Sequence, residues 1–217
     1  MNHIEQMFDL QKKLNDHTNG VMWVDGITKE NRKISWYRCI YMEAAEAIDS
    51  FNWKHWKGIN TEPDWANVKV ELVDIWHFIM SELIRIKDEN YANKYFKLKP
   101  QGDFNAEVLI NTLEKMLNLS VISNIDPKIS NIRDITDLFF TAISQLDMDI
   151  SELYKRYLVK NQLNVFRQQN GYKDGSYIKL WNTVEDNVVA FNIMDENPSI
   201  SPSELYQKLE FKYSQIR

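Results

Sequence analysis

Apolar residues recur at helical spacing along most of the chain, so the pattern predicts helices rather than strands. Leu10 and Leu14 belong to one such stripe, which predicts an amphipathic helix over residues 3–17 that ends near Gly20. Residues 68–80 are apolar almost all round, as expected of a helix that is packed on every side. The full set of predicted helices covers residues 3–17, 35–51, 65–88, 104–122, 132–147, 150–169 and 203–215.

The composition supports a helical fold. Only six glycines and five prolines occur among 217 residues, which leaves little material for the turns of a many-stranded protein. Hydrophobic residues make up 44% of the chain and charged residues 26%, the balance of an ordinary globular protein. We therefore predict one all-α domain over residues 1–217, a helical bundle with a rigid core in which residues 90–148 form a smaller mobile portion.

The net charge and the cysteine content limit the kinds of partner and the cellular compartment that we expect. The net charge of −5 argues against general nucleic-acid binding, although it leaves a nucleotide substrate open. Cys39 is the only cysteine, which excludes an intramolecular disulfide and fits a reducing cytosol. The N-terminal residues have no apolar run, and no segment approaches the roughly 18 apolar residues of a membrane span. We expect a cytoplasmic protein without a membrane or nucleic-acid partner.

Two of the predicted helices carry acid pairs at the same spacing, Glu43 with Glu46 and Glu71 with Asp74. Residues three apart lie on one helical face, so each helix can direct two carboxylates to one point. Such pairs are common on solvated helices, but here both lie in apolar segments with few basic residues nearby. Burying four carboxylates there would cost several kcal/mol each without compensation. Carboxylate ligands with retained waters are typical of Mg²⁺ or Mn²⁺, so the sequence predicts a polynuclear metal site.

His77 follows Asp74 by three residues, a spacing that also occurs in di-iron carboxylate bundles. Those bundles need the pattern on two helices, and the helix over 35–51 has no histidine. A hydrogen-bonded role beside the site is therefore favoured over metal ligation.

Four segments, in this order, resemble the dimeric all-α dUTPases of the all-α nucleoside triphosphate pyrophosphatase superfamily. They are LQKKLNDHTNG at 10–20, RCIYMEAAEAIDSFNWKHWK at 38–57, VELVDIWHFI at 70–79 and KNQLNVFRQQNGYKDGSYIKLWNTVEDN at 160–187. Residues 90–148 match poorly in detail. The resemblance implies a homodimer that hydrolyses dUTP, and dUDP, to dUMP with a magnesium-activated water. Such an enzyme keeps uracil out of DNA and supplies dUMP.

The resemblance also implies roles for individual residues. The magnesium ligands would be Glu43, Glu46, Glu71 and Asp74, with Mn²⁺ as a substitute ion, and Glu43 or Glu46 would take the proton of the water. The phosphates would be held by Lys160, Arg167, Tyr172, Lys179 and Asn187. The uracil and deoxyribose would be read by Gln11, Asn15 and Asn164.

Aromatic residues add three expectations. His55 stands where some relatives have a tryptophan that stacks on the base, so it is a candidate base contact. Trp53 and Trp56 are favoured as core side chains. Phe78 lies one turn after Asp74 on the same face, where it can press on the sugar and disfavour a 2′-hydroxyl.

The chemistry of these residues suits the implied reaction. Residues 170–187 are rich in glycine, asparagine and charge, and elsewhere would be interpreted as a solvated loop. Arg167 can engage phosphate bidentately, and Lys160 and Lys179 act as point charges. Tyr172, beside glycines, suggests a loop that closes over the substrate. A side-chain amide offers the donor and the acceptor that uracil needs, whereas cytosine would be mispaired.

Three other interpretations stay open at this point. The same fold could act on another nucleotide, such as dCTP. The chain could be a non-catalytic helical interaction protein, although four retained acids argue against this. A di-iron oxidase is the third alternative.

Overall fold

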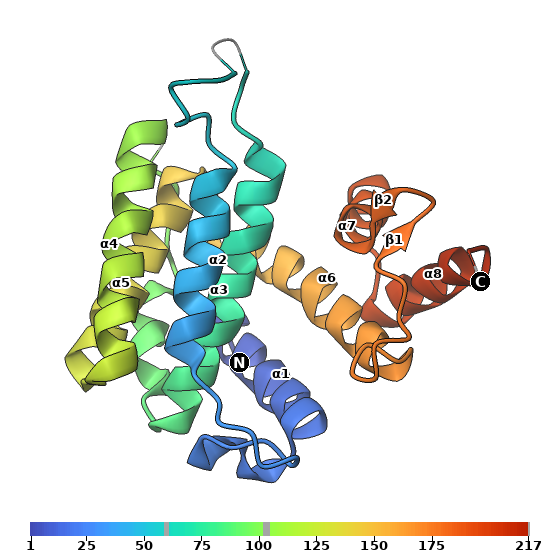
Figure 1. The fold of residues 1–217 in the computed structure, drawn as a ribbon, viewed down its shortest axis with the longest axis horizontal. Helices are drawn as coiled ribbons and strands as arrows, with labels where there is room; N and C mark the ends of the chain where they lie inside the picture. The colour runs from blue at the N-terminus through green and yellow to red at the C-terminus, as the bar shows by residue number, and fades with distance from the viewer. Residues whose placement is uncertain (59–60, 102–104, 217) are drawn as a thin grey trace. The chain divides into compact units, whose positions relative to one another are not determined.

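The structure is a computed structural model that describes residues 1–58, 61–101 and 105–216 (Figure 1). Almost all of its regular structure is helical, which confirms the predicted all-α fold. The chain divides into two compact units, Met1–Leu153 and Tyr154–Arg217. No helix among the described residues combines the length and the apolar character needed to cross a membrane.

The first unit contains five α-helices and two short 3-10 helices within its described residues. These elements are α1 (His3–Asn19), η1 (Val21–Asp25), α2 (Trp36–Asp49), α3 (Trp65–Arg85), η2 (Glu89–Tyr95), α4 (Ala106–Ile125) and α5 (Ile129–Gln145). The helix α6 (Ile150–Gln169) begins in this unit and continues into the second. The second unit then adds β1 (Leu180–Trp181), β2 (Val184–Glu185), α7 (Asp186–Glu196) and α8 (Pro202–Ser214).

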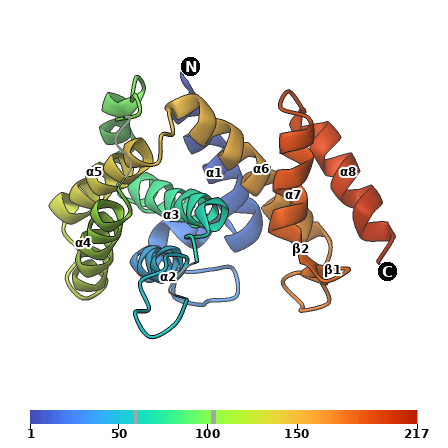
Figure 2. The same ribbon diagram turned by 90° about the horizontal axis from the view of Figure 1, so that it is seen from above.

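The helix α3 lies in the middle of the first unit, because its sequence is apolar on nearly every side (Figure 2). It packs against α1, α2 and α5, and α2 packs in turn against α4. Trp76, fully buried, stacks on Phe139 of α5 at 5.0 Å and meets Phe8 of α1 edge-on at 5.8 Å. The predicted all-round packing of residues 68–80 is thus confirmed, and the same helix carries half of the predicted metal ligands.

Polar caps fix where these helices begin. Asn2 and Glu5 form a capping box at α1, and the Ser35 hydroxyl accepts a hydrogen bond from the Arg38 amide at the start of α2. At the end of α1, Gly20 has φ +77°, a conformation that favours glycine. The predicted start of the fourth helix, residue 104, lies outside the described residues.

The segment 90–148 belongs to the first unit. The hydroxyls of Tyr91 and Tyr95 in η2 donate to the Asp137 carboxylate of α5, at 2.9 and 2.8 Å. Its helices α4 and α5 pack on α2 and α3 respectively. The mobility of residues 90–148 stays a prediction.

Candidate active site

Carboxylates of α2 and α3 meet where the two helices pack. Oxygens of Glu43, Glu46 and Glu71 all lie within 4.8 Å of one another. Asp74, one turn after Glu71, is close enough for its charge to act on Glu43. The structure therefore brings together the two acid pairs that the i, i+3 spacing predicted.

The burial of these acids differs from the expectation of four buried carboxylates. Only Glu71 is buried, at 8% exposure, whereas Glu43 and Asp74 are half-buried and Glu46 is exposed. Although α2 packs against α3, Glu46 lies on the side of α2 that is turned to solvent. Burial, followed by the charges of Asp74 and Glu71, raises the pKa of Glu43 to about 8.

Such a cluster of like charges is unfavourable unless a cation compensates it. Its donor set consists of carboxylate oxygens alone, with one exposed side through Glu46, which fits a hard divalent cation that retains water. The residues present therefore fit a divalent metal ion.

A second polar cluster lies between α1 and α3 and is almost fully buried. Gln11 and Asn15 are 2% and 4% exposed, and His77 and Ser81 are 3% and 0% exposed. The amide nitrogens of Gln11 and Asn15 donate to the Ser81 hydroxyl at 3.1 and 2.9 Å. His77 Nδ1 lies 2.6 Å from Gln11 Oε1. We call these four residues the amide cluster. His77 thus has the hydrogen-bonded role favoured from the sequence.

The two clusters are neighbours along α3. Ser81 lies seven positions after Asp74, roughly 10 Å along a helix axis. Phe78 lies between them in sequence, half-buried, with its ring stacked on Trp36 at 6.0 Å. The stacking on Trp36 restrains the Phe78 ring. The contact of this ring with a sugar stays a prediction.

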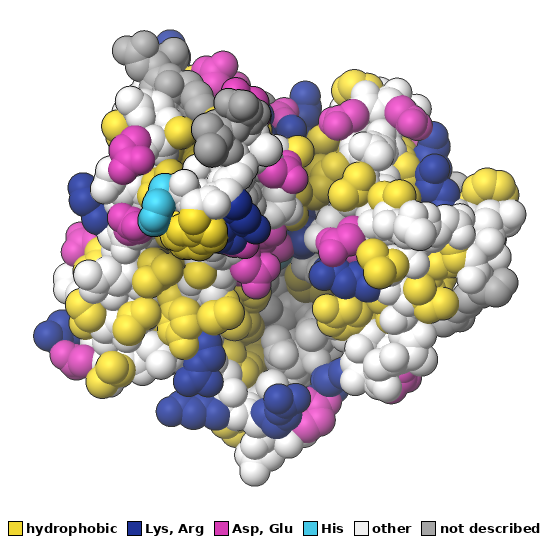
Figure 3. All heavy atoms as spheres, turned by 45° about the horizontal axis from the view of Figure 1, so that its top comes forward, with side chains coloured by type: hydrophobic (Ala, Val, Ile, Leu, Met, Phe, Trp, Pro, Cys, Tyr) yellow, Lys and Arg dark blue, Asp and Glu magenta, His cyan; other side chains and the backbone are white. Residues whose placement is uncertain are grey.

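The loop between α2 and α3 carries the exposed aromatic side chains Trp53, His55 and Trp56. Figure 3 shows hydrophobic, basic and histidine side chains together on the face that carries this loop. The assignment of Trp53 and Trp56 to the core is wrong, because they are 45% and 63% exposed and pack edge-on against each other beyond the end of α2. His55 contacts Trp56, with ring centroids 5.0 Å apart.

This loop precedes Trp65, at the opposite end of α3 from Ser81. The separation is roughly 24 Å along the helix. The structure therefore does not bring His55 to Gln11 and Asn15, and a base contact by His55 stays a prediction.

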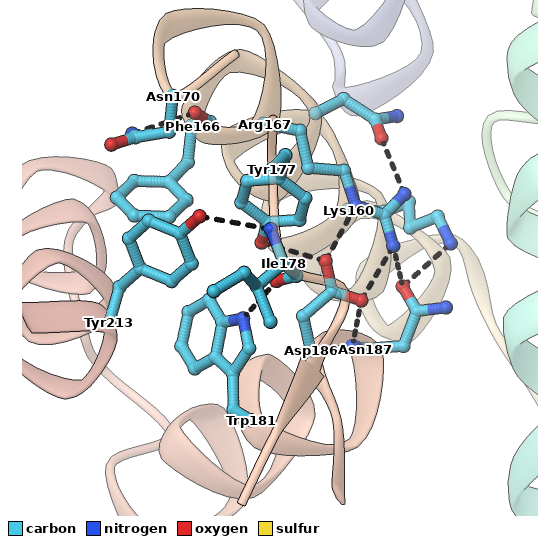
Figure 4. A network of polar contacts seen from close by, with 11 residues as sticks. Lys160, Phe166, Arg167, Asn170, Tyr177, Ile178, Trp181, Asp186, Asn187 and Tyr213 are labelled. Atoms are coloured by element: carbon cyan, nitrogen blue, oxygen red, sulfur yellow. Dashed lines mark hydrogen bonds and ion pairs between the residues drawn. The ribbon is translucent and has the colours of Figure 1, made fainter. Parts of the chain in front are cut away.

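In the second unit, predicted phosphate ligands converge around one buried ion pair (Figure 4). Arg167 Nε and Nη2 each donate to the Asp186 carboxylate at 2.8 Å. Asn187 Oδ1 accepts from Lys160 Nζ at 2.8 Å and from Arg167 Nη2 at 3.2 Å. Asn164 Oδ1 accepts from Arg167 Nη1 at 3.3 Å. Four residues that sequence reasoning selected are therefore side by side.

The other two predicted phosphate ligands are more exposed. The Tyr172 ring centroid lies 5.5 Å from the Arg167 guanidinium carbon, and the side chain is 42% exposed. Lys179 is exposed and immediately precedes β1. Their phosphate contacts stay predictions.

Sequence reasoning missed Asp186, Tyr177 and Ser81. Asp186 is fully buried and also accepts a hydrogen bond from the Tyr177 hydroxyl at 2.8 Å. Burial alone would raise the pKa of Asp186, but the hydrogen bonds and charge of Arg167 outweigh it and hold the pKa below its usual value. A signal for Asp186 was present, because acidic residues are common at the start of a helix. It could not be used, because α7 itself was not predicted.

A mostly helical chain that gathers carboxylates from two facing helices, beside a buried amide cluster, has the donor set expected of a metal-dependent hydrolase of the all-α class. A family model described as dUTPase matches residues 3–172. The chain therefore belongs to the dUTPase family, in its all-α form, and is a dUTP diphosphatase whose family uses a divalent metal. No individual curated protein matches it. The matched range includes both clusters of the first unit and ends before Lys179 and Asn187.

Proposed function

We propose that the protein hydrolyses dUDP as well as dUTP to dUMP, and that Mg²⁺ is its metal, held by Glu43, Glu46, Glu71 and Asp74. The observation that carries the proposal is the approach of three carboxylate oxygens within 4.8 Å, with Asp74 adding a fourth charge. A hard cation with oxygen ligands is the natural counter-charge for such a set. When bound, the ion supplies charge neutralisation for the phosphates and lowers the pKa of a water.

The chain's own carboxylates have different tasks. Glu71 is buried and fixed by α3, so it serves as a ligand. Glu46 is exposed, so a water molecule reaches it readily, and we propose that Glu46 accepts the proton of the attacking water with Glu43 beside it.

A nucleotide that lies along α3 can reach both clusters of the first unit. The roughly 10 Å between Asp74 and Ser81 suits the span from the phosphate next to the sugar to the far edge of the base. Gln11 and Asn15 are then proposed to read uracil, and Phe78, between the clusters, to pack against the deoxyribose. In the second unit, Lys160, Arg167, Tyr172, Lys179 and Asn187 are proposed to bind phosphate oxygens and Asn164 the nucleoside.

Two further properties are proposed. The resemblance implies that the active form is a homodimer, and the single cysteine fits a reducing cytoplasm. Light scattering of the purified protein tests the dimer directly.

The decisive experiment is a substrate panel. The protein is incubated with Mg²⁺ and, separately, dUTP, dUDP, dCTP, dTTP and UTP, and the products are separated by ion-exchange chromatography. Formation of dUMP from dUTP and dUDP, abolished by EDTA and restored by Mg²⁺, is expected. Turnover of dUTP without dUDP would remove the diphosphate from the proposal, and restoration only by another metal would remove Mg²⁺.

A variant locates the metal. Glu71→Gln should weaken Mg²⁺ binding, followed by calorimetry, whereas Asp49→Asn on the exposed side of α2 should not. Equal Mg²⁺ affinity in Glu71→Gln and the wild type would show that the metal is held elsewhere.

A further inference from the structure

The Ser81 hydroxyl is saturated by three hydrogen bonds. It donates to the His77 carbonyl of its own helix at 2.7 Å and accepts from the amide nitrogens of Gln11 and Asn15. A hydroxyl has one hydrogen and two lone pairs, so nothing remains to donate to an amide oxygen. Both side-chain amides must therefore turn their NH₂ groups toward Ser81.

The remaining contacts of the cluster agree with this orientation. Gln11 Nε2 also donates to Asn15 Oδ1 at 3.3 Å, which uses its second hydrogen. Because an amide oxygen only accepts, the 2.6 Å contact between Gln11 Oε1 and His77 requires the proton on His77 Nδ1. Asn15 has given one N–H and one oxygen lone pair to these contacts, so one N–H and one lone pair of its amide remain.

A donor and an acceptor on one amide match uracil. The oxygen can accept from N3–H of the base while the nitrogen donates to an adjacent carbonyl. Cytosine presents the reverse pattern, an acceptor at N3 beside an amino donor, and would match the same amide turned by 180°. The orientation of the Asn15 amide therefore decides which pyrimidine is accepted.

We propose that Ser81 is a specificity-determining residue that acts through Asn15, by holding its amide in the orientation that pairs with uracil and rejects cytosine. The inference rests on the proposed reading of the base by Asn15. If the amide turned, Asn15 Oδ1 would face the Ser81 oxygen with no hydrogen between them, in a site where both residues are at most 4% exposed. Unpaired polar atoms in such a site are disfavoured, so cytosine cannot be accommodated by a simple turn of the side chain.

The test is the ratio of kcat/KM for dUTP to that for dCTP, measured with Mg²⁺. Ser81→Ala removes the acceptor, and Ser81→Cys keeps the size while replacing oxygen with a weak acceptor. Both should lower the ratio by roughly tenfold or more, because a turned amide no longer loses a buried hydrogen bond. The kcat for dUTP should change little, since the carboxylates are untouched.

The matched control is Ser120→Ala. Ser120 is also fully buried and donates to the carbonyl one turn earlier, Met116, at 2.8 Å, but it lies in α4 away from the amides. It should lose stability to a similar extent and keep the wild-type ratio. Thermal unfolding confirms that each variant is folded.

A double variant separates this inference from the proposed function. In an Asn15→Ala background the ratio should already be low, and Ser81→Ala should lower it no further. An unchanged ratio in folded Ser81→Ala and Ser81→Cys, or an equal fall in the Asn15→Ala background, overturns the role of Ser81. A wild-type ratio in Asn15→Ala itself overturns the proposed reading of the base.

Discussion

Replacing Asp186 with asparagine removes one charge of the buried ion pair with Arg167. The guanidinium charge then stays buried without the carboxylate that compensates it. The Asp186 side chain is fully buried and that of Arg167 is 9% exposed, so solvent screens the pair weakly. Removing one partner of such a pair costs about 3–5 kcal/mol, and the amide oxygen of asparagine can still accept one bond. We expect a loss of about 3 kcal/mol in the free energy of unfolding at pH 7. For a chain of this size that lowers the Tm by roughly 6–12 °C.

The effect depends on pH in a defined direction. The pKa of Asp186 in the folded protein lies below its ordinary value of 3.8, so the folded state favours the charged carboxylate. Its stabilisation is complete above that ordinary value and is lost as the pH falls through the lower folded pKa. The difference in stability between wild type and Asp186→Asn should therefore be constant near neutral pH and shrink below about pH 4.

Urea unfolding, followed by tryptophan fluorescence at several pH values, measures this difference. Asp174→Asn is the control, because Asp174 lies in the same unit but is exposed, and it should change stability much less. A loss of under about 1 kcal/mol in Asp186→Asn at pH 7, or a difference that does not shrink in acid, would refute the reasoning.

Three further predictions concern activity and the loop after α6. Glu46→Gln should lower kcat for dUTP by roughly 10² or more, while Asp49→Asn on the same helix should retain it; near-normal turnover would show that Glu46 is misplaced. Phe78→Ala should raise turnover of UTP relative to dUTP in a competition assay, and an unchanged ratio would remove its role at the sugar. Gly171→Ala should destabilise more than Gly175→Ala, because both have positive φ but only at Gly171 would a Cβ meet a side-chain oxygen, at 2.0 Å. Equal midpoints in thermal unfolding would contradict this.

The sequence predicted the long helices well because their signal is local. The apolar pattern placed α3 within three residues of its observed end at Arg85, and the paired spacing of the acids located a real cluster. The short helix α7 was not predicted because its apolar stripe covers only Asp186–Glu196. It also follows a short hairpin whose two turn residues, Asn182 and Thr183, both have positive φ.

What the sequence could not show depends on contacts between distant segments. Ser81 is an ordinary small residue in an apolar helix, and its importance comes from hydrogen bonds to a helix about 70 positions earlier. The exposure of Trp56 could not be predicted either, because a large aromatic side chain favours the core unless the backbone carries it past the end of a helix.

The last helix gives the loop after α6 a support that the family match does not include. The Tyr213 ring stacks on Tyr177 at 5.1 Å, and its hydroxyl accepts a hydrogen bond from the Ile178 amide at 3.0 Å. A fragment cut at residue 172, where the match ends, would retain the carboxylate and amide clusters but lose this brace together with Lys179 and Asn187. The segment that is recognisable by comparison is therefore shorter than the segment that holds all of the proposed phosphate ligands, and expression of this protein should preserve its C-terminus.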